Sequence, residues 1–315
     1  MRLIRKQMKK LSKELFAKHE LKFMTVLAVI LFVALVFSIA FAPAGAKRAD
    51  VSAAPASISL KSFDDISIRA EAAYVYDVRT KKALYSKNAD RRLPLASLAK
   101  VMTALVASEM SPNNPTIVID KRAVVMEGDS GLRSGERWNL NDLLDFSLIS
   151  SSNDGMAAVA LALETPDKSF VGEMNKEADN LGMKNTYYFN ETGLDQSATT
   201  SGAYGSAQDV ATLFAHIIEH EPALLTATTK KEISGQTLDG AFYVATNTDG
   251  IVNQIPGVIG SKTGYTSLAG GNLVIAFDPE IGRPIVICVL GSTEQGRFED
   301  VKTLTAATLK SLNGQ

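Results

Sequence analysis

The chain has 315 residues, of which 46% are apolar and 21% charged, an ordinary balance for a globular protein with a sizeable core. Its formal net charge is −1, but residues 1–22 hold eight of the 33 basic residues and two of the 34 acidic ones, which leaves 25 basic against 32 acidic residues in the remainder. A mildly acidic body argues against nucleic acid as the partner.

The first feature along the chain is an apolar run over residues 23–42, behind the basic segment at residues 1–22. This run of 20 residues carries no charge and is long enough to cross the apolar core of a bilayer as one helix. The basic flank predicts that the N-terminus stays in the cytoplasm and that the rest lies outside the cell membrane. A cleaved signal peptide is the alternative, but its apolar part is usually about 7–15 residues long. We favour an uncleaved, single-pass anchor.

The remainder of the chain divides into a predicted linker and one folded domain. Residues 43–65 are rich in alanine, serine and proline, which favours a flexible linker, and we expect the domain over residues 66–313. Strands at both ends of this domain with helices between them predict one α+β unit. The expected elements, in chain order, are strands at 72–78 and 82–86, a helix at 95–110, two helices joined by a polar turn within 141–164, a helix at 206–220, strands at 271–277 and 284–290, and an amphipathic helix at 298–312.

The first chemical motif is S-x-x-K, formed by Ser97 and Lys100 in the predicted helix at 95–110. Residues three apart share a helix face, so the lysine amine can approach the serine hydroxyl. A serine hydroxyl is a weak nucleophile until an adjacent base takes its proton, and a desolvated lysine can serve as that base. By itself the motif is weak evidence, because chance supplies it in many proteins of this length.

The second motif is S-x-N, formed by Ser151 and Asn153 in the polar turn between two predicted helices. The hydroxyl could relay a proton to a leaving amine, and the carboxamide could hold a substrate amide. Ordinary turn chemistry is the alternative, because serine and asparagine populate turns for local hydrogen bonding alone.

The third motif is K-T-G at Lys262, Thr263 and Gly264. Glycine removes a side chain where a substrate backbone would lie against a strand edge, and the lysine and threonine would present a cation and a hydroxyl to a substrate carboxylate. A phosphate-binding loop is excluded, because Ser261 stands where that motif requires glycine.

The three motifs occur together in the order and with the spacing of penicillin-binding proteins and serine β-lactamases. Further matching segments at 94–103, 190–195 and 260–266 narrow the resemblance to the low-molecular-weight D-alanyl-D-alanine carboxypeptidases, over roughly residues 66–312. The resemblance implies an αβα sandwich, with an antiparallel sheet, helices on both of its faces and an all-helical lobe that carries the second motif. Ser152 departs from the glycine that is common in the middle of that motif.

The resemblance also implies roles for the motif residues. Ser97 would attack the terminal D-alanyl-D-alanine bond of peptidoglycan stem peptides, with the backbone N–H groups of Ser97 and Tyr265 as the oxyanion hole. Neither metal nor cofactor is implied, and β-lactam antibiotics would be covalent inhibitors. Arg297 is included by the resemblance, with an ordinary surface arginine as the alternative. The implied catalytic residues are Ser97, Lys100 and Ser151, and the implied substrate-binding residues are Asn153, Lys262, Thr263, Gly264, Tyr265 and Arg297.

Other functions of the same fold stay open at this point. A β-lactamase would need a general base for fast deacylation, and Glu191 lies near the expected place, but its surroundings match the carboxypeptidase pattern. A DD-transpeptidase would use the same residues, with an amine in place of water. A catalytically inactive peptidoglycan-binding scaffold is the non-enzymatic alternative, although it would have no need of three intact motifs.

A metalloprotease is the alternative from another mechanistic class, because His216 and His220 formally fit H-x-x-E-H. On a helical wheel the apolar stripe lies beside the histidines, which favours a solvated helix end over a metal site. The stripe comprises Val210, Leu213, Phe214 and Ile217.

Overall fold

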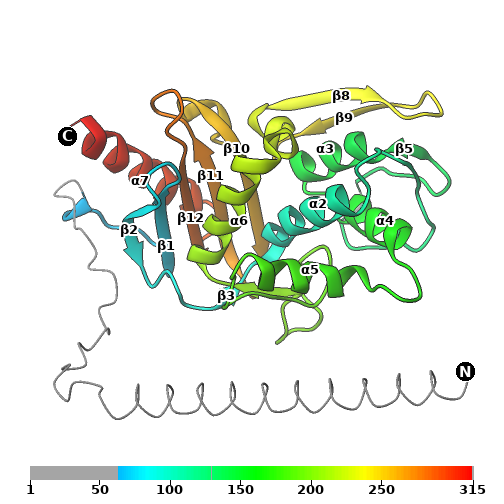
Figure 1. Ribbon diagram of the computed structural model, residues 1–315, viewed down its shortest axis with the longest axis horizontal. Coiled ribbons are helices and arrows are strands. Elements are labelled where there is room, and N and C mark those ends of the chain that lie inside the picture. Colours follow the sequence, from blue (N-terminus) through cyan, green and yellow to red (C-terminus); the bar gives the residue numbers. More distant parts are fainter. Residues whose placement is uncertain (1–62, 129, 314–315) are drawn as a thin grey trace, which may run out of the picture. The chain divides into compact units, whose positions relative to one another are not determined.

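The computed structural model describes residues 63–128 and 130–313, which belong to one compact unit (Figure 1). The predicted membrane segment at 23–42 lies outside these residues. Within the described ranges, no helix has the length and apolar character that a membrane crossing requires. The predicted segment boundaries at 22, 42 and 65 therefore stay predictions.

A five-stranded antiparallel sheet forms the centre of the domain, in the order β10-β11-β12-β1-β2. Strands from the two ends of the domain meet in it, because β1 pairs directly with β12 (Figure 1). The predicted strands at 72–78 and 82–86 and those at 271–277 and 284–290 are confirmed, whereas the K-T-G segment proves to be a full edge strand of its own. The strands are β1 (Ala72–Asp77), β2 (Lys82–Lys87), β10 (Val258–Thr266), β11 (Gly270–Phe277) and β12 (Ile285–Ser292).

Both faces of this sheet are covered, so its strands are apolar on both sides. Helix α7 (Gly296–Asn313) packs on β11 and β12 from one face, where Leu273 and Ile275 join its apolar side chains in one cluster. Helix α6 (Ala207–His220) packs on β1 and β12, and Val274 points into the cluster on that side. The αβα sandwich is confirmed.

An all-helical lobe lies beside the sheet. It contributes most of the hydrophobic cluster that also contains Val274 and the buried side chains of α6. The predicted helix at 95–110 begins as a 3-10 turn, and the predicted pair of helices within 141–164 is confirmed. Helix α5 was not predicted; its buried Phe170, Met174 and Ala178 recur every four residues amid a polar sequence. The helices are η2 (Ala96–Leu98), α2 (Ala99–Met110), α3 (Leu140–Ser150), α4 (Asn153–Leu163) and α5 (Phe170–Asn180).

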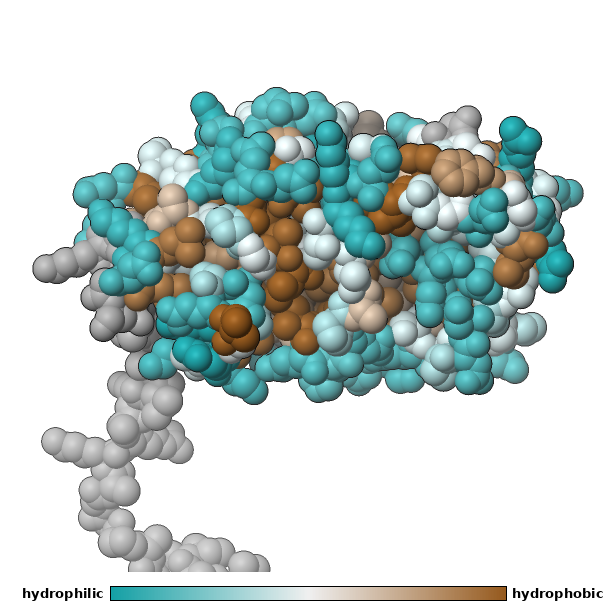
Figure 2. Space-filling view, turned by 90° about the horizontal axis from the view of Figure 1, so that it is seen from above, coloured by the Kyte–Doolittle hydropathy of each residue, from teal (hydrophilic) through white to brown (hydrophobic). Residues whose placement is uncertain are grey.

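A two-stranded ribbon of β8 (Glu232–Gln236) and β9 (Phe242–Thr246) lies over this lobe. Its inner face packs Tyr243 against the ring of Trp138, with centroids 4.6 Å apart. Its outer face exposes 69% of Phe242. The side of the molecule seen in Figure 2 is mostly hydrophilic, with apolar side chains gathered in small areas.

Short elements complete the domain and connect the sheet to the lobe. A three-stranded sheet in the order β3-β7-β6 holds the segment that precedes η2. The remaining elements are β3 (Leu93–Pro94), β4 (Thr116–Val118), β5 (Arg137–Asn139), β6 (Tyr187–Tyr188), β7 (Ala203–Gly205), η3 (Pro222–Thr229) and η4 (Val252–Gln254).

Candidate active site

Ser97 lies in the short turn η2 at the start of α2, and its surroundings hold the backbone in an unusual conformation. The preceding Ala96 has φ +49°, a left-handed value that non-glycine residues seldom adopt. From β11, Asn272 Nδ2 donates to the carbonyl oxygens of Pro94 at 2.9 Å and Leu95 at 3.1 Å. Such local strain persists where the surrounding contacts over-determine the structure, as they do here.

Lys100 is fully buried, and its amine lies between three oxygen atoms. Its Nζ is 2.8 Å from Ser97 Oγ, 2.6 Å from Asn153 Oδ1 and 2.7 Å from the Thr192 carbonyl oxygen. Burial lowers the pKa of Lys100 to about 7, because desolvation disfavours the ammonium, while the charge of Glu191 acts in the opposite direction. Near neutral pH this amine can take a proton from Ser97, as the predicted base must.

The S-x-N motif occupies the turn between α3 and α4, as predicted. Ser151 ends α3 in the left-handed conformation, with φ 61°. Ser152 caps α4, since its Oγ accepts from the N–H of Gly155 at 2.9 Å, so the serine that replaces a glycine strengthens this turn. Asn153 Nδ2 donates to the Glu127 carbonyl oxygen at 2.6 Å, which directs Oδ1 toward Lys100.

Lys262 reaches the same turn from the edge strand β10. Its Nζ donates to Ser151 Oγ at 2.8 Å and to the Thr263 carbonyl oxygen at 2.9 Å. Burial lowers the pKa of Lys262 well below its usual value, and the positive charges of Lys100 and Arg297 lower it further, against an opposing effect of Asp249. A substrate carboxylate would add a second negative charge to that of Asp249.

Gly264 allows β10 to lie directly against the segment that carries the nucleophile. A Cβ at this position would come within 2.8 Å of the Leu95 carbonyl oxygen and 3.2 Å of the Ser97 nitrogen. The sequence predicts a glycine that makes room for substrate, whereas the nearest neighbour is the chain's own backbone. The next residue is Tyr265, so the backbone N–H groups of Ser97 and Tyr265, which are predicted as the oxyanion hole, belong to adjacent segments. Tyr265 itself is 51% exposed.

Arg297 lies at the start of α7 and is buried, so it is not the surface arginine of the alternative interpretation. Its Nη1 donates to the Gly264 carbonyl oxygen at 2.9 Å, and its guanidinium lies over the Phe298 ring, 4.8 Å from the centroid. Arg297 therefore joins the group at β10, as the resemblance implies.

The predicted residues thus lie together around the start of α2, the α3–α4 turn and β10. Their individual roles stay predictions, because geometry alone assigns none of them. Sequence reasoning missed several further side chains in this group of residues, and it missed the carbonyl group of Thr192. One of the missed contacts is the 2.6 Å hydrogen bond between the hydroxyls of Thr248 and Thr263. The missed residues are Thr103, Asn190, Thr192, Thr248 and Asp249.

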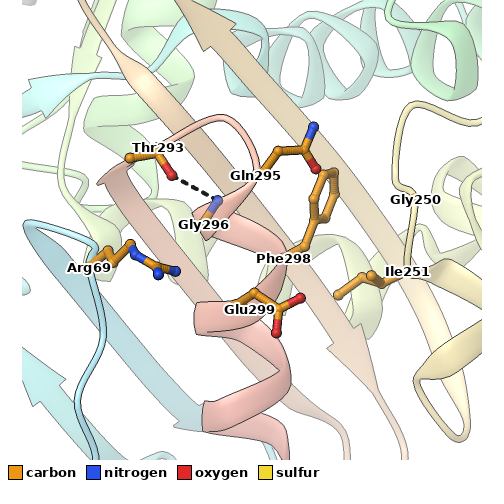
Figure 3. A pocket seen from close by; sticks show the side chains of 8 residues that line it. All are labelled: Arg69, Gly250, Ile251, Thr293, Gln295, Gly296, Phe298 and Glu299. Atoms are coloured by element: carbon orange, nitrogen blue, oxygen red, sulfur yellow. Dashed lines mark hydrogen bonds between the residues drawn. The ribbon is translucent and has the colours of Figure 1, made fainter.

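A pocket at the start of α7 is distinct from this group of residues (Figure 3). It lies next to the first turn of the helix, where Thr293 Oγ1 accepts from the N–H of Gly296 at 2.9 Å. None of the predicted site residues lines it. Its lining residues are Arg69, Gly250, Ile251, Thr293, Gln295, Gly296, Phe298 and Glu299.

The two histidines of the H-x-x-E-H pattern do not form a metal site with Glu219 in the described part of the chain. Their rings stack on each other with centroids 4.3 Å apart, and the predicted apolar stripe beside them is buried. His216 instead lies near Glu109 and Glu177, with ligand atoms within 4.8 Å of one another. Exposed acidic groups often gather in this way without an ion.

Comparison with known proteins agrees with the geometry. A family profile described as D-alanyl-D-alanine carboxypeptidase matches residues 57–294. D-alanyl-D-alanine carboxypeptidase DacF of Bacillus subtilis is 32% identical over 247 residues, which are 76% of this chain and 62% of that protein. DacA of Escherichia coli is 30% identical over 270 residues, covering 78% of this chain and 65% of that one. The chain thus spans less than two thirds of the length of these relatives.

Solved structures share the fold over most of their length. A Mycobacterium tuberculosis D-alanyl-D-alanine carboxypeptidase superposes with a TM-score of 0.70 at 28% identity, covering 78% of this chain and 92% of that one. Penicillin-binding protein D2 of Listeria monocytogenes in its cefotaxime-bound form gives 0.66 at 28% identity, with 78% and 99% covered. A mutant of a Streptomyces DD-transpeptidase gives 0.71 at 26% identity, with 78% and 99% covered. The chain belongs to the D-alanyl-D-alanine carboxypeptidase family, with a penicillin-binding-protein fold.

Proposed function

We propose that this protein is a serine-type D-alanyl-D-alanine carboxypeptidase that removes the terminal D-alanine from peptidoglycan stem pentapeptides. The observation that carries the proposal is the buried amine of Lys100, 2.8 Å from Ser97 Oγ and with its pKa lowered to about 7. A hydroxyl beside such a base is an activated nucleophile. The names of the matching family and of its curated relatives support the substrate.

In the first half of the reaction, Lys100 takes the proton of Ser97 while Oγ attacks the carbonyl carbon of the penultimate D-alanine. The backbone N–H groups of Ser97 and Tyr265 donate to the oxygen as it becomes negative, which is where preorganised donors lower the barrier most. The substrate carboxylate lies against Lys262 and Thr263. Its negative charge would add to that of Asp249 and so favour the ammonium form of Lys262.

In the second half, the peptide bond breaks, and the proton that Lys100 took from Ser97 passes through the Ser151 hydroxyl, which lies 2.8 Å from Lys262 Nζ, to the leaving amine of D-alanine. Lys100 is then neutral again and takes a proton from the water that attacks the ester on Ser97. It returns this proton to Ser97 Oγ as the ester bond breaks. The products are free D-alanine and a shortened stem peptide, and the protein returns to its starting state.

Transfer to an acceptor amine is the second candidate, because a Streptomyces DD-transpeptidase shares the fold at a TM-score of 0.71. The chemistry up to the acyl-enzyme is the same, and only the attacking group differs. Mass spectrometry of the products from a pentapeptide, with and without an acceptor amine, tests both. Free D-alanine with the shortened peptide supports the carboxypeptidase, and a cross-linked product supports the transpeptidase. If neither product forms, the proposed function is contradicted.

We also propose that residues 23–42 anchor the protein in the cell membrane, with the domain at 66–313 outside the cell and residues 43–65 as the linker. The support is an uncharged run of 20 residues behind eight basic ones. We expect the mature protein to keep residues 1–42, to resist extraction by high salt and to lose its domain to protease added outside. A mature N-terminus between residues 43 and 47 contradicts the anchor and leaves the enzymatic proposal unaffected.

A further inference from the structure

Helix α2 binds two consecutive carbonyl groups of the turn that follows residue 190. Lys100 Nζ donates to the Thr192 carbonyl oxygen at 2.7 Å, and Thr103 Oγ1 donates to the Glu191 carbonyl oxygen at 2.6 Å. Lysine and threonine lie three residues apart, so they share one face of the helix. Thr103 is completely buried, and the roles assigned to the motif residues do not involve it.

The hydrogens of the Lys100 amine explain why these carbonyl groups matter. A neutral amine has two N–H donors and one lone pair, and it acts as a base only where that lone pair faces the hydroxyl of Ser97. Asn153 Oδ1 and the Thr192 carbonyl oxygen can only accept hydrogen bonds. Together they take both N–H groups and leave the lone pair for Ser97, whose Oγ is 2.8 Å away.

The turn that presents this carbonyl group is held in shape from within and attached to α2 by a side chain. Asn190 Oδ1 accepts from the N–H groups of Thr192 at 3.2 Å and Gly193 at 2.7 Å. Among the described residues, Lys100 and Thr103 are the α2 residues whose side chains form hydrogen bonds to this turn.

We propose that Thr103 is a positioning residue, which holds the Thr192 carbonyl group against Lys100 and so keeps the lone pair of the amine directed at Ser97. The inference rests on the proposed function, because it concerns the base of that reaction. It gives a role to the threonine that follows the S-x-x-K motif by one helical turn and to the carbonyl group of a turn distant in sequence.

The expected effect of losing the Thr103 hydroxyl has two parts. Without its acceptor at Thr192, an N–H of Lys100 is free to turn toward Ser97, so the acylation rate at high pH falls. A hydrogen bond to a charged donor favours the charged form, so its loss also lowers the pKa of Lys100 further. Glu191 and Lys262 are the charged groups next to this amine, and the substitution leaves both in place. Mere loosening of the fold would lower the melting temperature without moving that pKa.

The experiment compares Thr103→Val, which keeps the shape and loses the hydroxyl, with Thr103→Ser, which restores it. The matched control is Thr308→Val in α7, where an equally buried hydroxyl donates to the Leu304 carbonyl oxygen at 2.7 Å. Acylation of the full chain by a labelled penicillin is followed from about pH 5 to about pH 10, with a melting temperature for each variant. The net strength of one hydrogen bond predicts a plateau rate about tenfold lower for Thr103→Val, with the midpoint of the acid limb at lower pH. Thr103→Ser and Thr308→Val should keep both values of the unchanged protein.

Several outcomes would overturn the inference. One is a plateau rate and an acid midpoint in Thr103→Val that equal those of the unchanged protein. Another is a plateau rate in Thr103→Ser or in the Thr308→Val control that falls as far as that of Thr103→Val. Should Thr103→Val fail to fold, Asn190→Ala loosens the turn from its other side, and an unchanged profile there also contradicts the inference. If the unchanged protein is not acylated on Ser97, the proposed function fails and this inference fails with it. Acylation that is indifferent to Thr103 defeats the inference alone.

Discussion

The two lysines of the site are both buried, but their surroundings differ. Lys100, at the start of a helix, lies among three oxygen atoms, and burial is the main cause that lowers its pKa to about 7. Lys262, on an edge strand, is hydrogen bonded to Ser151 and to the next carbonyl group, and the positive charges of Lys100 and Arg297 add to the effect of burial.

This difference indicates how lysine can be suited to two functions within one site, as a base and as an anion-binding group. An amine that faces hydrogen-bond acceptors and one hydroxyl is equipped to gain a proton from that hydroxyl. An amine whose pKa is lowered by burial and by neighbouring cations is equipped to bind an anion, because the anion favours its ammonium form. We call the surroundings of Lys100 on α2 the helix side of the site and those of Lys262 on β10 the strand side. The helix side is expected to govern the chemical step, and the strand side is expected to govern the binding of the substrate carboxylate.

The largest expected effect is on the helix side, at the nucleophile itself. Ser97→Ala should abolish the covalent adduct with a labelled penicillin, because no other hydroxyl is 2.8 Å from Lys100 Nζ among the described residues. The measurement is labelled protein on a denaturing gel, with the unchanged chain as control. An adduct that persists in the variant would refute the assignment of Ser97.

Removing each lysine in turn tests the division between the two sides. Lys100→Ala should slow acylation by about 10²–10⁴-fold, the usual contribution of a general base. Lys262→Ala should act mainly on KM for a pentapeptide, since it removes a charge from the proposed carboxylate site. Steady-state release of D-alanine separates the two effects. The same change in kcat and KM for both variants would mean that the two lysines are not functionally distinct.

The pH profile sharpens the comparison without any substitution. Only the neutral amine of Lys100 can accept a proton, so acylation should fall about tenfold per pH unit below about pH 7 and level off above it. A lysine with its usual pKa of about 10.4 would give a rate still rising at pH 9. Acylation rates of the full chain across this range decide between the two. A rate that rises steadily to pH 10 would show that the environment of Lys100 is not as described.

Gly264→Ala should disturb both sides at once, because the added Cβ would meet the backbone at Leu95 and Ser97. Either β10 or the nucleophile's segment must shift, and overpacking of this kind costs about 1–3 kcal/mol of stability. Gly250→Ala is the matched control, since its Cβ would meet only the Phe298 ring, at 3.9 Å. Melting temperature and penicillin acylation should both fall in Gly264→Ala alone. Full activity in that variant would mean that this close approach is not needed.

The sequence predicts the parts of this site that depend on local spacing. The i, i+3 relation of Ser97 and Lys100, the turn at Ser151 and the late strands all follow from short-range patterns, and the structure has them in place. The antiparallel sheet with helices on both faces was also expected from the resemblance. These features are local in sequence or shared by a whole family, and both kinds of signal can be read without coordinates.

The sequence does not predict contacts that join distant segments through single atoms. The Thr192 carbonyl group has no sequence signature, since every residue has one, yet it lies 2.7 Å from Lys100 Nζ across 92 positions. Thr103 reads as one more buried helix residue until its partner is known. The close approach of Gly264 to the backbone of Leu95 and Ser97 was likewise not predicted, because the two segments lie far apart in the chain.

The smallest expected effect concerns the strand side alone. Thr248 Oγ1 lies 2.6 Å from Thr263 Oγ1, so it holds the hydroxyl that is proposed to meet the substrate carboxylate. Thr248→Val keeps the shape and removes this hydrogen bond, whose net value is about 0.5–1.5 kcal/mol. KM for a pentapeptide should therefore rise about 2- to 13-fold, with kcat nearly unchanged and the midpoint of the pH profile still set by Lys100. Thr248→Ser should restore KM. A fall in kcat with a constant KM would instead place Thr248 with the chemical step, and the separation of the two sides would then be wrong.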